Sequence, residues 1–222
     1  MRLTPSFLVI TALFITLLIA SNVIAVKLIV IAGVVLPAAI VIFPLSYIFG
    51  DVLTEVYGYA QARRVIWLGF LCNLVFVGAV YAGQVLPPAA FWQGQSAYEA
   101  ILGFTPRVLV ASFVAYLVGE FANAVVLARL KVVTKGRFLW TRTIGSTLIG
   151  QGLDSLVFIT VAFAGTANMN LAEVIVSQWL FKVGYEALAT PFTYVVVGWL
   201  KRHEGIDTYD YQTNFSPLAV TH

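Results

Sequence analysis

Residues 106–129 read PRVLVASFVAYLVGEFANAVVLAR, and this stretch decides the class of fold. Glu120 is the only charged residue between Arg107 and Arg129. A helix needs about 20 predominantly apolar residues to cross the roughly 30 Å hydrocarbon core of a bilayer. The run is continuously apolar rather than alternating, which favours a membrane-spanning helix over a strand of a membrane barrel.

Five further runs of this kind flank it, and they determine the expected architecture. Apolar residues make up 60% of the 222 positions and charged residues only 10%, whereas an average soluble domain is about 45–50% apolar and about 25% charged. We therefore expect an all-α integral membrane protein, with a six-transmembrane-helix bundle over residues 1–202 and a loose, polar cytoplasmic tail over 203–222. Pro44 and Pro191 fall inside two of the runs and predict kinks. The six expected spans are 6–28, 34–57, 63–86, 106–129, 143–165 and 171–200.

Basic residues gather in alternate connections between these spans. Cytoplasmic loops of membrane proteins carry an excess of lysine and arginine, and ten of the 13 basic residues fall on one side of a six-span arrangement. We therefore predict a multi-pass protein in the lipid bilayer with both termini in the cytoplasm. The ten residues are Arg2, Arg63, Arg64, Arg129, Lys131, Lys135, Arg137, Arg142, Lys201 and Arg202.

Several classes of function find no support in the sequence. The formal net charge is only +3 and the basic residues sit in short loops, so a nucleic-acid partner is not expected. The single cysteine, Cys72, allows no disulfide within the chain, and His203 and His222 lie outside the spans, so we expect no metal site and no cofactor. No serine–histidine pair, paired-aspartate motif or metal-ligand cluster indicates an enzyme, and no nucleotide-binding loop is present.

Polar side chains inside the spans are the candidates for function, because a charged residue at mid-bilayer costs about 2.5–3.5 kcal/mol to insert. Residues three or four apart share one face of a helix, and three spans carry such a polar face. The candidates are Glu120 and Asn123 with Tyr116 in one span, Gln151, Asp154 and Ser155 in the next, and Gln178, Lys182 and Glu186 in the last, with Ser21 and Asn22 in the first span and Asp51 and Glu55 ending the second.

Four charged residues are expected to lie deepest in the membrane: Glu120, Asp154, Lys182 and Glu186. They are expected to fall into two groups. Lys182 and Glu186 are one turn apart, so they can neutralise each other along one helix. Glu120 and Asp154 are left without a second cation. We therefore expect both carboxyl groups to face a common central cavity, where at least one contacts a solute or a coupling proton.

Asp51 and Glu55 differ from the other acidic residues because they are expected near the inner membrane surface. Arg63 and Arg64 follow after a reversal at Gly58, where glycine permits a tight turn. A salt-bridge clamp at the inner surface is one reading of this arrangement. A gate or a direct role in binding is the other.

Carboxylates, amides and aromatic rings together suit a planar solute that forms hydrogen bonds. A guanine-like edge presents adjacent N–H donors, and one carboxylate can accept two of them. The amides of Asn123 and Gln151 can donate to a ring carbonyl. A vitamin, an amine or a metal ion would also find partners here. The rings available for stacking are Tyr116, Phe158, Trp179 and Tyr185.

Several short motifs follow one another along the chain from about residue 18 to 200. They are Asp51-Val-Leu-Thr-Glu55-Val-Tyr-Gly58 with Ala62-Arg-Arg64, Ser21-Asn22 with Lys27, Gly119-Glu120-Phe-Ala-Asn123, Arg142-Thr-Ile-Gly-Ser-Thr147 with Gly150-Gln151 and Asp154-Ser155, and Phe181-Lys182 leading to Pro191. With these motifs the chain resembles the queuosine precursor transporter family, a vitamin-uptake transporter family.

The resemblance implies an importer in the inner membrane of a bacterium or archaeon. The expected solutes are queuosine precursors, which are 7-deazaguanine compounds, salvaged for tRNA queuosine. It also implies six helices similar to the substrate-binding subunits of energy-coupling-factor vitamin transporters. The matching positions suggest that the solute site is lined by Asn22, Glu55, Glu120, Asn123, Gln151, Asp154, Ser155, Lys182 and Glu186.

Two alternatives to this function and several energy sources stay open. The chain could import another small vitamin-like or nucleobase solute, or it could be a membrane scaffold subunit without transport activity. As a transporter it could be a gradient-linked carrier, a facilitator, or a subunit that needs a separate energising ATPase partner. A homo-oligomer is equally compatible with the sequence.

Overall fold

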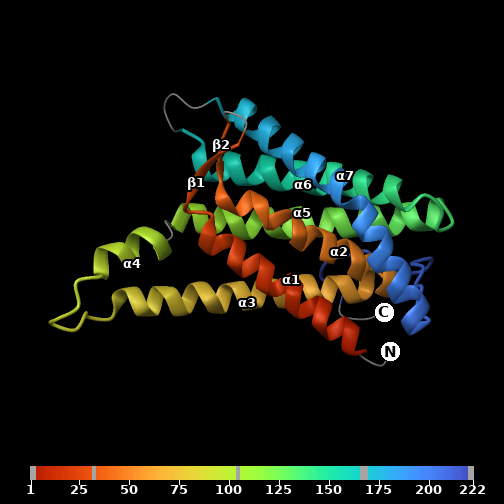
Figure 1. The fold of residues 1–222 in the computed structure, drawn as a ribbon, viewed down its shortest axis with the longest axis horizontal. Coiled ribbons are helices and arrows are strands. Elements are labelled where there is room, and N and C mark those ends of the chain that lie inside the picture. Colours follow the sequence, from red (N-terminus) through yellow and green to blue (C-terminus); the bar gives the residue numbers. More distant parts are fainter. Residues whose placement is uncertain (1–3, 32–33, 104–105, 166–169, 220–222) are drawn as a thin grey trace.

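In the computed structural model, six long helices form a bundle, and two short strands lie at one of its ends (Figure 1). The structure describes residues 4–31, 34–103, 106–165 and 170–219, and all counts here refer to these residues. The long helices are α1 Pro5–Ile24, α2 Phe43–Tyr57, α3 Tyr59–Val85, α5 Pro106–Val133, α6 Leu139–Phe163 and α7 Leu171–Glu204. The shorter elements are β1 Leu28–Ile31, β2 Val34–Pro37, the 3-10 turn η1 Ala38–Val41 and α4 Gln95–Leu102.

Five helical stretches of the described residues are long and apolar enough to cross a membrane. They are Pro5–Ile24, Ala38–Tyr57, Tyr59–Val85, a stretch that contains α5, and Leu139–Phe163. The remaining long helix, α7, has 34 residues, but Glu173, Lys182 and Glu186 interrupt the apolar run of its sequence. The chain is therefore a multi-pass membrane protein.

Helix α2 is the centre of the bundle. It contacts α1, α3, α5 and α7, and its residues from Ser46 to Tyr57 are buried except for Phe49. Pro44 stands in the first turn of α2, where proline is well tolerated because the first N–H groups of a helix have no partner within it. The expected kink at Pro44 is therefore wrong, whereas Pro191 does lie inside α7.

A β-hairpin stands where the first expected span was to end and the second was to begin. β1 pairs antiparallel with β2, from Leu28 opposite Pro37 to Ile31 opposite Val34. Valine and isoleucine dominate this segment, and their branched side chains favour extended backbone. The spans expected over 6–28 and 34–57 are thus shorter as α-helices than predicted.

The two ends of the bundle differ in what they carry (Figure 1). The chain termini, the α2–α3 turn and the α5–α6 connection lie at one end, which we call the termini end. The hairpin, α4 and the start of α7 lie at the other, which we call the hairpin end. The long helices therefore alternate in direction through the bundle.

The segment after α7 is folded against the termini end, so the expectation of a loose tail is wrong. The backbone N–H of Tyr59 donates to Asp210 Oδ2 at 3.0 Å. Arg63 Nη1 donates to the carbonyl oxygens of Asn214 at 2.9 Å and Ser216 at 3.1 Å. Two of these three acceptors are backbone carbonyls, which every residue type supplies. The amino-acid composition of the segment therefore does not reveal that it packs against the bundle.

We predict that Gly58→Ala lowers the free energy of unfolding by about 1–3 kcal/mol. Gly58 has φ 82° and ψ 165°, a region that is essentially restricted to glycine and costs other residues about that much. A Cβ there would also lie 2.7 Å from Thr208 Cγ2. Thermal unfolding in detergent measures the change.

Gly78→Ala is the matched control, because a Cβ at Gly78 in α3 meets no atom within 4 Å. Its unfolding temperature should equal or exceed that of the wild type, since alanine favours a helix over glycine. Equal unfolding temperatures for the two variants would contradict the conformation assigned to Gly58.

Candidate functional site

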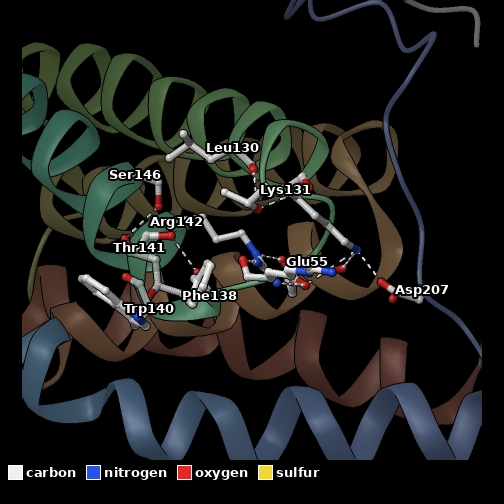
Figure 2. Close-up of polar contacts among 12 residues, drawn as sticks. Glu55, Leu130, Lys131, Phe138, Trp140, Thr141, Arg142, Ser146 and Asp207 are labelled. Atoms are coloured by element: carbon white, nitrogen blue, oxygen red, sulfur yellow. Dashed lines mark hydrogen bonds and ion pairs between the residues drawn. The ribbon is translucent and has the colours of Figure 1, made fainter.

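A cluster of charges at the termini end surrounds Glu55, whose side chain is fully buried (Figure 2). Arg142 Nε and Nη2 donate to Oε2 and Oε1 of Glu55, each at 2.7 Å. Lys201 Nζ lies 2.6 Å from Glu55 Oε1, and Lys131 Nζ lies 3.7 Å from it. We call these four residues and Asp207 the ion cluster, and it joins α2, α5, α6 and α7.

Asp207 connects the segment after α7 to the ion cluster. Its Oδ1 accepts hydrogen bonds from Lys131 Nζ and, at 2.9 Å, from Lys201 Nζ. Burial alone would raise the pKa of the Asp207 carboxyl, but the two lysines outweigh burial and hold the pKa below its ordinary value. The segment is thus held by charge as well as by backbone contacts.

The salt-bridge clamp that was one reading of Asp51 and Glu55 is present at Glu55, but its partners are Arg142, Lys201 and Lys131 rather than Arg63. Arg63 donates to backbone carbonyls of the segment after α7, and Arg64 donates to Gln61. Glu55 instead pairs with residues far along the chain, and Asp51 accepts from Asn123 Nδ2 at 2.6 Å. Contacts between distant residues cannot be read from neighbouring sequence.

Lys182 pairs across the bundle rather than along its own helix. Its Nζ lies 2.6 Å from Asp154 Oδ2 on α6 and 3.4 Å from Ser155 Oγ, and it lies 4.8 Å from the centre of the Phe43 ring. The predicted neutralisation of Lys182 by Glu186 is therefore wrong. Direct packing of α6 against α7 presents a closer carboxylate than the one a turn away.

A cavity of about 140 Å³ lies beside this ion pair. We call it the solute cavity. Residues of α1, the hairpin, η1, α2, α3, α5, α6 and α7 line it. Seven of the candidate residues are among them: Ser21, Asn22, Tyr116, Asp154, Phe158, Gln178 and Lys182.

The other predicted residues lie elsewhere. Glu120 and Asn123 line a separate, narrow gap beside Gly50 and Phe14, so Glu120 and Asp154 are both buried but do not share the solute cavity. Trp179 Nε1 donates to the carbonyl oxygen of Leu148 at 2.9 Å. The candidate residues that do not line the solute cavity are Asp51, Glu55, Glu120, Asn123, Gln151, Ser155, Glu186, Trp179 and Tyr185.

Sequence reasoning missed several residues that build the site. Asn73 on α3 lines the solute cavity, and its Oδ1 accepts from Asn22 Nδ2 at 3.0 Å. Phe43 lines the cavity beneath Lys182. Asn73 could have been found, because it is a polar residue inside an apolar span, as the candidate residues from the sequence are. Phe43 is apolar like its neighbours, so the sequence gives no sign of its position.

Acidic, histidine and cysteine side chains are the usual protein ligands of metal ions. Within residues 4–31, 34–103, 106–165 and 170–219, no group of three or more such side chains could hold a metal ion. The interior thus holds two contrasting environments. The termini end contains the ion cluster, and the solute cavity is lined by amides, aromatic rings and one ion pair.

Comparison with known proteins places these features in a family. Residues 37–196 match the family described as "Putative vitamin uptake transporter", and this range includes α2 to α6 and most of α7. The chain is 29% identical over 178 residues to the "Probable queuosine precursor transporter" of Bacillus subtilis (strain 168), covering 79% of this chain and 78% of that protein.

Two further relatives match shorter parts. The "Queuosine precursor transporter" of Escherichia coli (strain K12) is 29% identical over 149 residues, which are 64% of this chain and 63% of that protein. The "Probable queuosine precursor transporter" of Haemophilus influenzae is 28% identical over 131 residues, which are 59% and 53%. No solved structure matches the chain.

We predict that Asp154→Asn and Lys182→Met each destabilise the protein strongly, whereas the double variant recovers much of the loss. Removing one partner of a buried ion pair leaves an uncompensated charge and costs roughly 3–5 kcal/mol, but removing both partners leaves none. Thermal unfolding in detergent, analysed as a double-mutant cycle, measures the coupling.

The control combines Lys182→Met with Glu186→Gln. Because Glu186 does not pair with Lys182, this second change should not recover stability. Recovery with Glu186→Gln but not with Asp154→Asn would show that the pairing runs along α7 instead.

Proposed function

The chain belongs to the vitamin uptake transporter family, and we propose that it imports queuosine precursors, which are 7-deazaguanine compounds. It is a membrane transporter rather than an enzyme. The names of the three relatives support this class of solute. A small molecule is therefore its cargo, and the lipid bilayer is its environment.

The observation that carries the proposal is the composition of the solute cavity. Asp154 can accept two adjacent N–H groups from a guanine-like edge, and its pairing with Lys182 leaves lone pairs free for this. The amides of Asn22 and Asn73 offer both donors and acceptors for the rest of a base. Tyr116 and Phe158 can stack on its faces, as aromatic residues do with nucleobases in general.

The membrane arrangement is part of the proposal. We infer that α7 crosses the membrane with the other five long helices, giving a six-helix domain over residues 1–202 similar to energy-coupling-factor substrate-binding subunits. The termini end faces the cytoplasm of a bacterium or archaeon, and residues 203–222 form a polar cytoplasmic segment. The ten basic residues that the sequence places on the side of the termini support this orientation.

The polar residues outside the cavity fit the same function in other roles. Glu120, Asn123, Gln151 and Glu186 lie buried within the bundle, where a solute would pass after leaving the solute cavity. Glu55 in the ion cluster closes the termini end and acts as a gate. Either a homo-oligomer or a separate energising subunit is compatible with this arrangement.

We predict that Phe158→Leu raises the KM for uptake of a labelled 7-deazaguanine about 5- to 150-fold. Stacking of a base on an aromatic ring contributes about 1–3 kcal/mol, and leucine keeps the apolar volume without the ring face. Uptake is measured in a bacterial strain that neither synthesises nor imports the compound, and it is normalised to the inserted protein.

Phe192→Leu on α7 is the matched control, because Phe192 is 58% exposed and does not line the solute cavity. It should transport like the wild type. No uptake of any 7-deazaguanine by the wild type would refute the solute, and equal KM values for the two variants would refute the cavity as its site.

We predict that a membrane-impermeant maleimide labels Gln95→Cys but not Lys135→Cys in intact cells. Gln95 begins α4 at the hairpin end, whereas Lys135 lies between α5 and α6 at the termini end. Both variants carry Cys72→Ala, which removes the native thiol. Labelling of Lys135→Cys alone would invert the proposed orientation.

A further inference from the structure

Four buried polar residues occupy a level of the bundle between the solute cavity and the ion cluster. Helices α2, α5, α6 and α7 each carry one of these residues. On each helix it lies, along the chain, between a residue that lines the solute cavity and a residue of the ion cluster. Asp51 follows Phe43 and precedes Glu55 on α2, for example. The four residues are Asp51, Asn123, Gln151 and Glu186, and we call them the polar layer.

The polar layer holds oxygen atoms that no donor satisfies. Asp51 Oδ2, Asn123 Oδ1, Gln151 Oε1 and both carboxylate oxygens of Glu186 have no hydrogen-bond partner within the described part of the chain. Each of these side chains belongs to a residue that is only 1% exposed. Buried polar atoms almost always have partners, so five such acceptors at one level need an explanation.

Three kinds of contact bring these residues together. Asn123 Nδ2 donates to Asp51 Oδ1 at 2.6 Å, which directs the amide of Asn123 toward this carboxylate. A Cβ added to Gly150, the neighbour of Gln151, would lie 2.6 Å from Asn123 Cβ, so α5 and α6 are in close contact here. Helix α2, which carries Asp51, also packs against α7, which carries Glu186.

The buried cations on the described parts of the surrounding helices are committed to other carboxylates. Lys182 is paired with Asp154, whereas Lys131, Arg142 and Lys201 surround Glu55. Asp51 and Glu186 are therefore two buried carboxylates without an ion-pair partner among the described residues, although buried charges are normally paired.

We propose that the polar layer binds a sodium ion. Carboxylate and amide oxygens are the ligands that hard cations prefer. Protonation of one carboxylate would supply only one donor and leave the amide oxygens of Asn123 and Gln151 unsatisfied, whereas a metal ion contacts several oxygens at once. The layer offers five unpartnered oxygens, fewer than the about six to eight oxygen ligands that Ca²⁺ takes, and this is the ground for choosing a monovalent cation.

The test compares thermal unfolding of the purified full chain in sodium chloride and in choline chloride at equal ionic strength. At a sodium concentration about tenfold above Kd, linkage predicts that the wild-type Tm rises by about 3–6 °C. Asp51→Asn and Glu186→Gln should lose this rise. Glu99→Gln on the exposed helix α4 is the control and should keep it. The assay contains no solute, so its outcome is independent of the proposed transport function.

Three results would overturn the proposal. They are an equal wild-type Tm in the two salts, a sodium-dependent rise that survives Glu186→Gln, and a Tm that follows pH but not sodium. If the carboxylate variants do not fold, Gln151→Leu provides the test, because it removes one neutral ligand without removing charge. This variant should need about tenfold more sodium for the same rise in Tm, and an unchanged sodium dependence would count against the site.

Discussion

Glu55 is a fully buried carboxylate, and segments from across the chain are arranged around its charge. A charge in an apolar interior is costly unless it is paired and hydrogen-bonded. Arg142 supplies a bidentate pairing from α6, Lys201 and Lys131 supply positive charge from α7 and α5, and Asp207 ties the segment after α7 to both lysines. The termini end is thereby closed by ionic contacts between four helices.

The same constraint orders the rest of the interior along the bundle axis. At the ion cluster, three cations surround two carboxylates. At the solute cavity, Lys182 and Asp154 neutralise each other and leave acceptors free. Between the two lies the polar layer, where oxygen atoms have no donors. An importer needs a site that can be reached from one side and closed from the other. The order of solute cavity, polar layer and ion cluster along the bundle axis meets that requirement.

The sequence predicted the membrane class and the helices well, because the apolar runs are long and a bilayer imposes their length. It also identified Asp154 and Lys182, since charges inside apolar runs stand out. Their pairing was not predictable, and neither was that of Glu55 with Arg142, because partners 87 residues apart meet only through helix packing. Phe43 was missed because an apolar residue at a cavity looks like any other apolar residue.

The most direct test of this account is an experimental structure with a 7-deazaguanine bound. The account predicts that the base occupies the solute cavity, with its N–H edge on Asp154 and its ring against Tyr116 or Phe158. The ion cluster around Glu55 should remain closed in a state open toward the hairpin end. A base bound outside this cavity, or a cavity that stays empty at saturating solute, would contradict the account.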